Sequence, residues 1–216
     1  MIAVTFALPS ESSGFRRHFT AQKDEITILH TGVGEKVCRA RIEPFLSSGH
    51  FDFLISSGFA GGTAPSLGVG DLLLAENFSD PDLLKRAHDL LVARVGQLAT
   101  AARVIETAAE RNQFAQEHDA SAVDMETAWI AEACARRAIR MLSLRVISDT
   151  AADPFPAPPS ILFDLGRQKT PVLKLGGYLL RHPAGVVRLG RFAQQIAQAR
   201  ASLTSALLVL AHELRV

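Results

Sequence analysis

Short apolar runs alternate with longer segments of helical periodicity along this chain. Five runs are typical of buried strands, because they are apolar or alternating and end at proline, glycine or polar clusters. The predicted strands are Ile2–Leu8, Glu25–Thr31, Phe51–Ser57, Asp71–Glu76 and Met141–Ser148. The predicted helices are Lys36–Ser48, Glu106–His118, Thr127–Ala138 and a long tail from about Ser160 to the end. This alternation predicts an α/β fold, a three-layer αβα sandwich with a mixed, largely parallel central sheet.

Composition narrows the function classes. The chain has 216 residues, 48% of them apolar, and a net charge of +1, so we expect one domain spanning 1–216 and no nucleic-acid partner. Cys38 and Cys134 lie far apart without a Cys-x-x-Cys pair, which argues against a disulfide framework or a zinc site. We expect no cofactor and no metal. The N-terminal residues lack the pattern of a signal peptide and no apolar run reaches about 20 residues, so a cytoplasmic protein is expected.

Small residues, glycines and acids follow the predicted strands. They form four segments: Pro9–Gly14, Thr31–Gly34, Ser56–Gly62 and Ser148–Asp153. In largely parallel sheets, ligands bind beyond the ends of the strands. Glycine allows a close approach of the backbone, and N–H groups at a helix start bind anions or hydroxyls. These segments therefore predict a ligand site at one edge of the sheet.

Each acid in these segments also has a purely structural interpretation. Glu11, Asp124 and Glu126 are placed as helix-start acids, and Asp149 as a cap or turn residue. Taken one at a time, such residues are more often structural than functional. The three glycines within Ser56–Gly62 are more than a turn requires. The combination of all these features favours a binding site.

Four ordered motifs resemble one protein family. SSGFAGGTAPSLGVGDLLLAE (Ser56–Glu76) resembles the ribose-cradling segment of methylthioadenosine/S-adenosylhomocysteine nucleosidases and related purine nucleoside phosphorylases. AVDMETAWIAEAC is similar to their Val-Glu-Met-Glu-Ala element, with Asp124 in place of the first Glu, and LRVISDTAAD is similar to their Ile-Ser-Asp segment. The first strand followed by Glu11, and TGVGEKV, match in order and spacing. The resemblance covers residues 1 to about 155 and implies a nucleoside phosphorylase-like fold.

The resemblance also implies chemical roles. Cleavage of a purine–ribose bond passes through an oxocarbenium-like sugar, and the leaving purine needs a proton at N7. Asp149 would supply that proton as a general acid in a partly dry pocket, and its other oxygen would accept from a 6-amino group, favouring adenine. Glu126 would accept hydrogen bonds from the ribose hydroxyls, with Met125 packed against the sugar. The predicted substrate-binding residues are Gly34, Ser57, Gly58, Phe59, Ala60, Gly61, Val123, Asp124, Met125, Glu126 and Ser148.

The attacking group is water or phosphate. Glu11 stands where the nucleosidases that the chain resembles keep a general base for water. The Gly-Asp-Pro-x-Arg type of phosphate loop of the bacterial phosphorylases is missing here. Water is therefore favoured as the attacking group. The alternative is that Arg16, Arg17 or glycine amides bind phosphate. The family resemblance further implies a homodimer or a higher homo-oligomer.

Two departures from the nucleosidase pattern concern the substrate. Only about 50 residues separate Asp71 from Asp124, and Thr100–Val104 replaces a Ser-Gly-Asp-Ala-Phe stretch. The segment Lys169–Leu203 contains no acid, but has several Lys and Arg residues among leucines and valines. Such a segment either lies on an anionic membrane surface or forms a core helix with a solvated basic edge.

With these departures the chain resembles the hopanoid-associated branch, the adenosylhopane nucleosidases or phosphorylases. That resemblance implies removal of adenine from a C35 hopanoid that carries a 5′-adenosyl group, with possible peripheral contact to the membrane. Two alternatives stay open. One is a soluble nucleosidase or phosphorylase acting on methylthioadenosine, S-adenosylhomocysteine or a free purine nucleoside. The other is a non-catalytic adenosine-binding protein.

Overall fold

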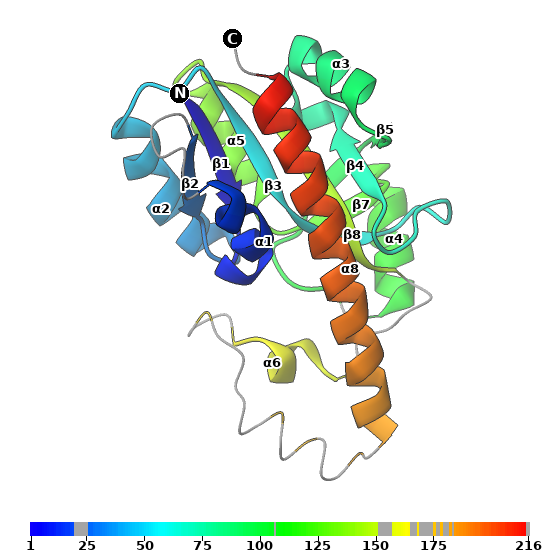
Figure 1. Ribbon diagram of the computed structural model, residues 1–216. Coiled ribbons are helices and arrows are strands. Elements are labelled where there is room, and N and C mark those ends of the chain that lie inside the picture. Colours follow the sequence, from blue (N-terminus) through cyan, green and yellow to red (C-terminus); the bar gives the residue numbers. More distant parts are fainter. Residues whose placement is uncertain are drawn as a thin grey trace.

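The computed structural model describes residues 1–19, 26–105, 107–150, 157–164, 168, 175, 178, 182 and 184–214. Eight strands form one sheet in the order β2-β1-β3-β8-β4-β5, with β7 paired to β3 and β6 paired to β7 (Figure 1). The strands are β1 (Ile2–Phe6), β2 (Ile26–His30), β3 (Phe53–Gly62), β4 (Leu72–Ala75), β5 (Arg94–Gly96), β6 (Leu98–Thr100), β7 (Ala122–Asp124) and β8 (Arg140–Thr150).

Most of the strand pairs are parallel. β1 runs parallel to β2 and β3, and β3 runs parallel to β8, whereas β4 is antiparallel to β8 and β7 is antiparallel to β3. This confirms the mixed, largely parallel sheet. The register shifts between Ala60 and Gly61, which pair with Ile147 and Asp149, so Ser148 is an extra residue on β8. A bulge of this kind re-aims the side chains beside it. The carboxyl ends of β1, β3 and β8 thus meet at one edge, with Ser148 and Asp149 at the irregularity.

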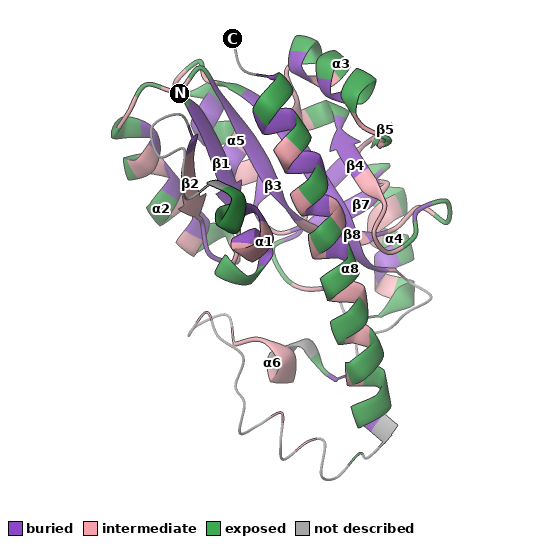
Figure 2. Ribbon diagram, viewed as in Figure 1, coloured by how far each residue is buried: buried purple, intermediate pink, exposed green. Residues whose placement is uncertain are grey.

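Helices cover both faces of the sheet, as the predicted sandwich requires (Figure 1). α2 and α5 pack on one face, where the cluster that contains Cys38 and Cys134 is buried. α1, α3 and α8 pack on the other face over the larger cluster, which contains Phe6 and Leu207. Figure 2 shows the buried positions gathered on the strands and on the helix sides that face them. The helices are α1 (Pro9–Phe19), α2 (Glu35–Ser47), η1 (Glu76–Phe78), α3 (Pro81–Leu90), α4 (Ala108–His118), α5 (Thr127–Ala135), α6 (Pro159–Leu162) and α8 (Ala184–Glu213).

The C-terminal tail is not the continuous helix that the sequence predicts. After α6, Phe163 and Asp164 are outside any helix, whereas Leu175, Tyr178 and α8 are helical. The prediction of one helix from about Ser160 is therefore wrong at Phe163 and Asp164. Most of the predicted basic segment between 169 and 183 lies outside the described residues. No helix in the described ranges is long and apolar enough to cross a membrane.

The two halves of α8 have different surroundings. The second half packs into the larger core through residues that are almost fully buried: Ala199, Leu203, Ala206, Leu207, Leu210 and Ala211. In the first half, Val186 is 55% exposed and Val187 is 62% exposed. Figure 2 shows this half of the helix extending beyond the sheet with mostly exposed positions. The core-helix interpretation therefore holds for the second half of α8 and not for the first.

Some elements were not predicted from the sequence. α1 was anticipated only through the interpretation of Glu11 as a helix-start acid. α3 was not predicted as a helix, although it has a clear start signal: the Asp80 side chain accepts from the N–H groups of Asp82 and Leu83, and Pro81 occupies the first turn. β7 covers Ala122–Asp124, which the sequence places at the mouth of a helix. This short strand pairs with β3 and β6, so it places the residues after it at the edge where β3 ends.

Candidate functional site

A cavity of about 260 Å³ lies at the edge where β3 and β8 end. Ten of the thirteen residues predicted for the site line it, namely Glu11, Phe59, Ala60, Gly61, Val123, Asp124, Met125, Glu126, Ser148 and Asp149. Ser57 and Gly58 instead line a much smaller adjoining pocket together with Glu11 and Glu126. Gly34 reaches the site through its backbone N–H, which donates to Glu126. Segments far apart in the sequence therefore meet at one place, as predicted.

Glu11 lies in the first turn of α1, directly after β1. Its Oε2 accepts from the backbone N–H groups of Ala7 and Leu8, at 2.9 and 3.1 Å. The side chain is buried, and this burial raises the pKa of Glu11 to about 7, although the backbone hydrogen bonds work in the opposite direction. A carboxyl group with this pKa exchanges its proton near neutral pH, as a general base requires. Gly58 lies beside it, and a Cβ there would make an ordinary van der Waals contact with Oε2, at 3.5 Å.

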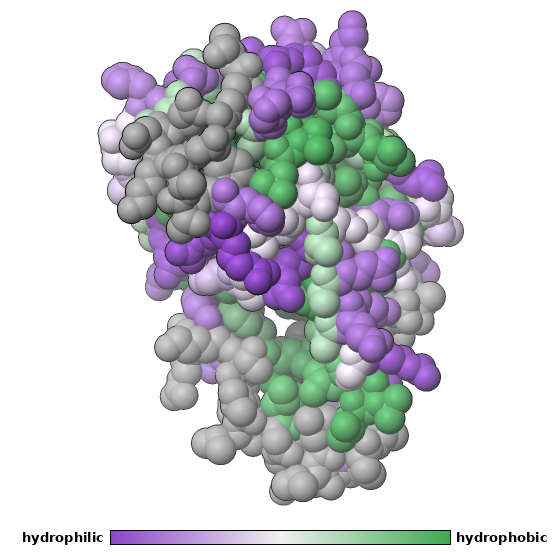
Figure 3. Space-filling model, in the orientation of Figure 1, coloured by the Kyte–Doolittle hydropathy of each residue, from purple (hydrophilic) through white to green (hydrophobic). Residues whose placement is uncertain are grey.

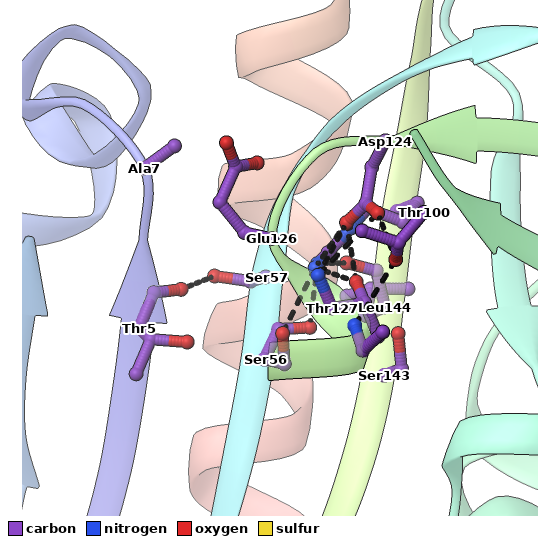
Figure 4. A network of polar contacts seen from close by, with 12 residues as sticks. Thr5, Ala7, Ser56, Ser57, Thr100, Asp124, Glu126, Thr127, Ser143 and Leu144 are labelled. Atoms are coloured by element: carbon purple, nitrogen blue, oxygen red, sulfur yellow. Dashed lines mark hydrogen bonds and ion pairs between the residues drawn. The ribbon is translucent and has the colours of Figure 1, made fainter. Parts of the chain in front are cut away.

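Glu126 is the second buried carboxyl group. Its Oε1 accepts from the N–H of Gly34 at 2.9 Å, and Gly34 has a φ of +87°, which favours glycine. Burial raises the pKa of Glu126, and the nearby negative charges of Asp124 and Glu11 add to the increase. In Figure 4 its carboxyl group points away from the polar network beside it, and no dashed contact reaches it. This side chain is therefore placed to accept hydrogen bonds from a ligand.

Asp124 has a different environment. One of its oxygens accepts from the N–H of Thr127 at 3.1 Å, and the other accepts from the Thr100 hydroxyl at 2.8 Å. Arg145 forms an ion pair with it at 3.0 Å, and this side chain of Asp124 is only 1% exposed. Figure 4 shows these contacts converging at the start of α5. The structure thus gives Asp124 the helix-start role, and its predicted contact with substrate is supported only by its place on the cavity wall.

Arg145 is the centre of this network and was not singled out from the sequence. Its guanidinium also donates to the carbonyl of Ser56 at 2.8 Å and to the Ser56 hydroxyl at 2.9 Å. Arg145 lies in the middle of β8 and is 2% exposed. Its positive charge acts against the increase in pKa of Glu11 and Glu126. The sequence does hold a signal for it, because Arg145 is the one charged residue within the predicted strand Met141–Ser148.

Asp149 forms a buried ion pair with Arg111 of α4. The Arg111 Nη2 lies 2.6 Å from Oδ2, and the Ser148 hydroxyl donates to Oδ1 at 2.7 Å. Both side chains of the ion pair are less than 10% exposed. The sequence gave no reason to expect this partner. Both oxygens of Asp149 already accept a hydrogen bond. Asp149 can therefore contact a purine only if Arg111 or Ser148 moves away, or if one oxygen takes a second hydrogen bond.

The rest of the cavity wall is largely apolar. It is formed by Ala101, Val104 and Ile105 after β6, and by Phe192 and Ile196 of α8. Phe192 and Ile196 are four residues apart, so they lie on the same face of the helix. Gln168 links the C-terminal region to the cavity wall at Val33. Its side-chain amide accepts from the N–H of Val33 at 2.7 Å and donates to the Val33 carbonyl at 3.1 Å. The acids thus line one part of the cavity and apolar side chains line another.

A larger cleft exists elsewhere, but it lacks comparable chemistry. It has a volume of about 790 Å³ and lies between the end of α3 and the second half of α8. Asp71 and Arg94 are its charged lining residues. Within the described ranges, no group of three or more His, Cys, Asp or Glu side chains is arranged to hold a metal ion. The smaller cavity, with its buried carboxyl groups, is therefore the candidate site.

Comparisons with known proteins agree with this picture. Residues 76–170 match the family model of the Phosphorylase superfamily. No curated protein matches the chain by sequence. Among solved structures, futalosine hydrolase of Helicobacter pylori has a TM-score of 0.72 at 16% identity, covering 98% of this chain and 97% of that one.

Two further structures are nucleosidases. A 5′-methylthioadenosine/S-adenosylhomocysteine nucleosidase of Helicobacter pylori, in complex with a substituted pyrrolidinol, has a TM-score of 0.72 at 16% identity, and the match covers 98% of this chain and 97% of that one. The corresponding nucleosidase of S. pneumoniae, with a transition-state inhibitor, has a TM-score of 0.73 at 17% identity and covers 99% of both chains. The fold of this chain is therefore that of the nucleosidases and nucleoside phosphorylases.

Proposed function

We propose that this protein cleaves the purine N-glycosidic bond of a 5′-substituted adenosine, with water as the attacking group. The observation that carries this proposal is the convergence of Glu11, Glu126 and Asp149 on one cavity, although Glu11 is more than a hundred residues from the other two in the sequence. The match to the Phosphorylase superfamily and the shared fold with nucleosidases support it. A protein that only bound adenosine would have no use for both a general base and a general acid in one cavity.

In the proposed reaction the bond between C1′ and the purine breaks first. Its electron pair moves into the purine. Asp149, which has first moved from Arg111 and taken up a proton from solvent, gives that proton to N7, so that a neutral base leaves. The sugar becomes positively charged. Glu11 accepts a proton from water, whose oxygen then forms the new bond to C1′. The products are the free base and a ribose that keeps its 5′ substituent, and both catalytic carboxyl groups regain their starting state by proton exchange.

Glu126 is assigned to the sugar. Its carboxyl group faces away from the internal network and accepts from the N–H of Gly34 at one oxygen, Oε1. Oε2 can therefore accept from ribose hydroxyls while the negative charge stabilises the cationic sugar. Met125 lines the same wall and would pack on the ribose. Water is favoured over phosphate because Arg16 and Arg17 do not line the cavity. The arginines at the cavity have acidic partners: Arg111 pairs with Asp149, Arg103 with Glu110 and Arg145 with Asp124.

Adenine release from a panel of 5′-substituted adenosines, measured with and without inorganic phosphate, tests this function. We expect adenine to appear without phosphate, at a rate that phosphate leaves unchanged. Methylthioadenosine, adenosine and a lipid-linked adenosine cover the open substrate classes. Release that requires phosphate would show phosphorolysis. Binding of these nucleosides without any release would show the non-catalytic adenosine-binding protein and would contradict the proposal.

The finer proposal is that the 5′ substituent is a membrane lipid, as in adenosylhopane. The first half of α8 connects the cavity with an exposed apolar and basic surface. Phe192 and Ile196 line the cavity, while Val186, Val187 and Arg188 are exposed on the turns before them. Figure 3 shows apolar side chains gathered around α6 and these first turns of α8. Residues 184–212 include no acid, so this surface suits an anionic membrane.

Charge reversal on this surface should weaken binding to anionic vesicles. Each Lys or Arg near such a membrane contributes roughly 1 kcal/mol, so we expect the double change Arg188→Glu and Arg191→Glu to reduce vesicle binding by well over tenfold at low salt. Turnover of a lipid-linked adenosine should fall with it, and turnover of methylthioadenosine should not. Co-sedimentation with vesicles at low and high salt measures this.

A matched control has the same change in net charge on α3, Lys85→Glu with Arg86→Glu. We expect this control to bind vesicles much as the unaltered protein does. Equal loss from both double variants would show a general charge effect. Failure of the unaltered protein to bind anionic vesicles at low salt would contradict the membrane proposal, while leaving the nucleosidase proposal in place.

A further inference from the structure

The side chain of Gln168 makes a two-point contact with the loop that follows β2. Its Oε1 accepts from the N–H of Val33 at 2.7 Å, and its Nε2 donates to the Val33 carbonyl at 3.1 Å. A carboxamide has both a donor and an acceptor, so it pairs with the N–H and C=O of one residue as a neighbouring strand residue does. Gln168 itself has a φ of +52°, a conformation that costs free energy in a residue other than glycine and persists where surrounding contacts fix it. The contact is therefore a specific feature of the fold.

The loop that Gln168 contacts has little stiffness of its own. Val33 stands between Gly32 and Gly34, whose φ values of +78° and +87° lie in the left-handed region. Glycine adopts either sign of φ with similar ease, so the peptide groups on both sides of Val33 can rotate unless another contact holds them. A Cβ at Gly32 would lie 3.1 Å from the Gln168 Oε1, so the loop and the amide approach each other closely. Gln168 supplies the contact that fixes these peptide groups.

One peptide group connects Gln168 with Glu126. The Val33 carbonyl accepts from Gln168, and the N–H of Gly34, which belongs to the same peptide group, donates to the Glu126 Oε1 at 2.9 Å. This peptide group is planar and trans, so its carbonyl and its N–H point in opposite directions. Gln168 thus holds the group from one side, and Glu126 accepts from it on the other. Rotation of this one group would break both hydrogen bonds.

The contact affects the sugar end of the cavity rather than the base end. Val33 lines the cavity and Gln168 does not, so Gln168 can act on a substrate only through the loop. Burial raises the pKa of Glu126, and the hydrogen bond from Gly34 acts against that increase. The Gly34 N–H therefore both orients the carboxyl group and favours its ionised form, which is the form that stabilises a cationic sugar.

We propose that Gln168 is a positioning residue, which fixes the peptide group between Val33 and Gly34 so that its N–H holds Glu126 in place for the ribose. This inference rests on the proposed nucleosidase function and extends the residues that serve it to the region after α6. The contacts of Asp149 with the base are separate from this chain of hydrogen bonds. Loss of Gln168 should therefore weaken recognition of the sugar and leave recognition of the base intact.

The variant Gln168→Met keeps the size of the side chain and removes both hydrogen bonds. We expect it to lower kcat/KM for methylthioadenosine by roughly 10- to 100-fold, the effect of losing one hydrogen bond to a charged group. Calorimetric affinity for free adenine, which has no sugar, should stay unchanged. Gln168→Glu still accepts from the Val33 N–H but cannot donate to the carbonyl, so we expect a similar loss. The matched control Gln198→Met removes an amide that donates to the Val69 carbonyl away from the cavity, and it should change neither quantity.

A double variant shows whether Gln168 acts through Glu126. If it does, Gln168→Met should lower kcat/KM far less in a Glu126→Gln background than in the unaltered protein. The melting temperature shows that each variant folds. Additive losses, an equal fall in adenine affinity, or normal kcat/KM in both Gln168 variants would overturn the proposal. An unaltered protein that cleaves no nucleoside would instead contradict the nucleosidase function itself, and this inference with it.

Discussion

Replacement of Asp149 by Asn is expected to lower the turnover of a 5′-substituted adenosine by about 10²–10⁴-fold, the usual contribution of a general acid. The amide has nearly the same shape but cannot give a proton to N7. KM should change much less than kcat, because the amide oxygen can still accept from the 6-amino group. Steady-state release of adenine measures both constants. Asp89→Asn, at the exposed end of α3, is the matched control and should have ordinary activity.

The ion pair with Arg111 requires a further check on this variant. Removing one member of a buried ion pair typically costs 3–5 kcal/mol of folding free energy, because the other charge stays buried without a partner. The double variant Asp149→Asn with Arg111→Met removes both charges. If the double variant melts close to the unaltered protein and is still inactive, the loss is chemical. Near-normal turnover in a folded Asp149→Asn variant would exclude Asp149 as the general acid.

Glu11→Gln is expected to abolish attack by water and to leave substrate binding largely intact. The unaltered protein should show kcat/KM rising with pH through about 7, because burial raises the pKa of Glu11 to about 7 and the base must be ionised to act. Glu126→Gln should instead weaken both binding and turnover, since its contact with the sugar strengthens as positive charge develops. Inhibitor or product affinity, measured alongside kcat, separates the two roles. Equal loss of binding from both variants would contradict this division.

Stability gives an independent readout for Glu11. The pKa of its carboxyl group is raised from 4.5 to about 7 in the folded chain, so the folded state binds this proton more tightly than the unfolded state. The stability gained in this way is full below about pH 4.5 and is lost as the pH rises through about 7. Glu11→Gln cannot lose a proton. At pH 8 this variant should therefore melt at a higher temperature than the unaltered protein. The difference in unfolding free energy should be at most on the order of 3 kcal/mol. Both differences should vanish in acid.

The strands were predictable because a strand that is buried on both faces appears in the sequence as a short, continuous apolar run. The predicted run Ile2–Leu8 became β1, and Met141–Ser148 became β8, with ends that moved by at most two residues. β3 was underestimated, since it continues to Gly62 through a glycine-rich segment that the sequence presents as a loop. Glycine has a low intrinsic preference for strands. Here the backbone hydrogen bonds to β8 and β7 hold the glycine-rich segment in the sheet.

The carboxyl groups of the site were predictable from their place after strands, but their partners were not. An ion pair such as Arg111–Asp149 joins positions 38 residues apart, and no local pattern in α4 announces it. Asp124 illustrates the same limit. The sequence leaves both a helix-start role and a ligand role open for it, and only the position of Arg145 beside it shows which one its oxygens serve. Long-range electrostatic pairs require the tertiary structure.

The buried charges around the cavity do not balance. Four carboxyl groups line it, Glu11, Asp124, Glu126 and Asp149, against the buried guanidinium groups of Arg111 and Arg145, while Arg103 on the wall is paired with Glu110. Bound protons make up part of this difference, because burial raises the pKa of both Glu11 and Glu126. A ribosyl cation would offset more of it at the moment when the glycosidic bond is broken. The carboxyl groups around the cavity should therefore stabilise the short-lived cation of the proposed reaction more than they stabilise the neutral nucleoside.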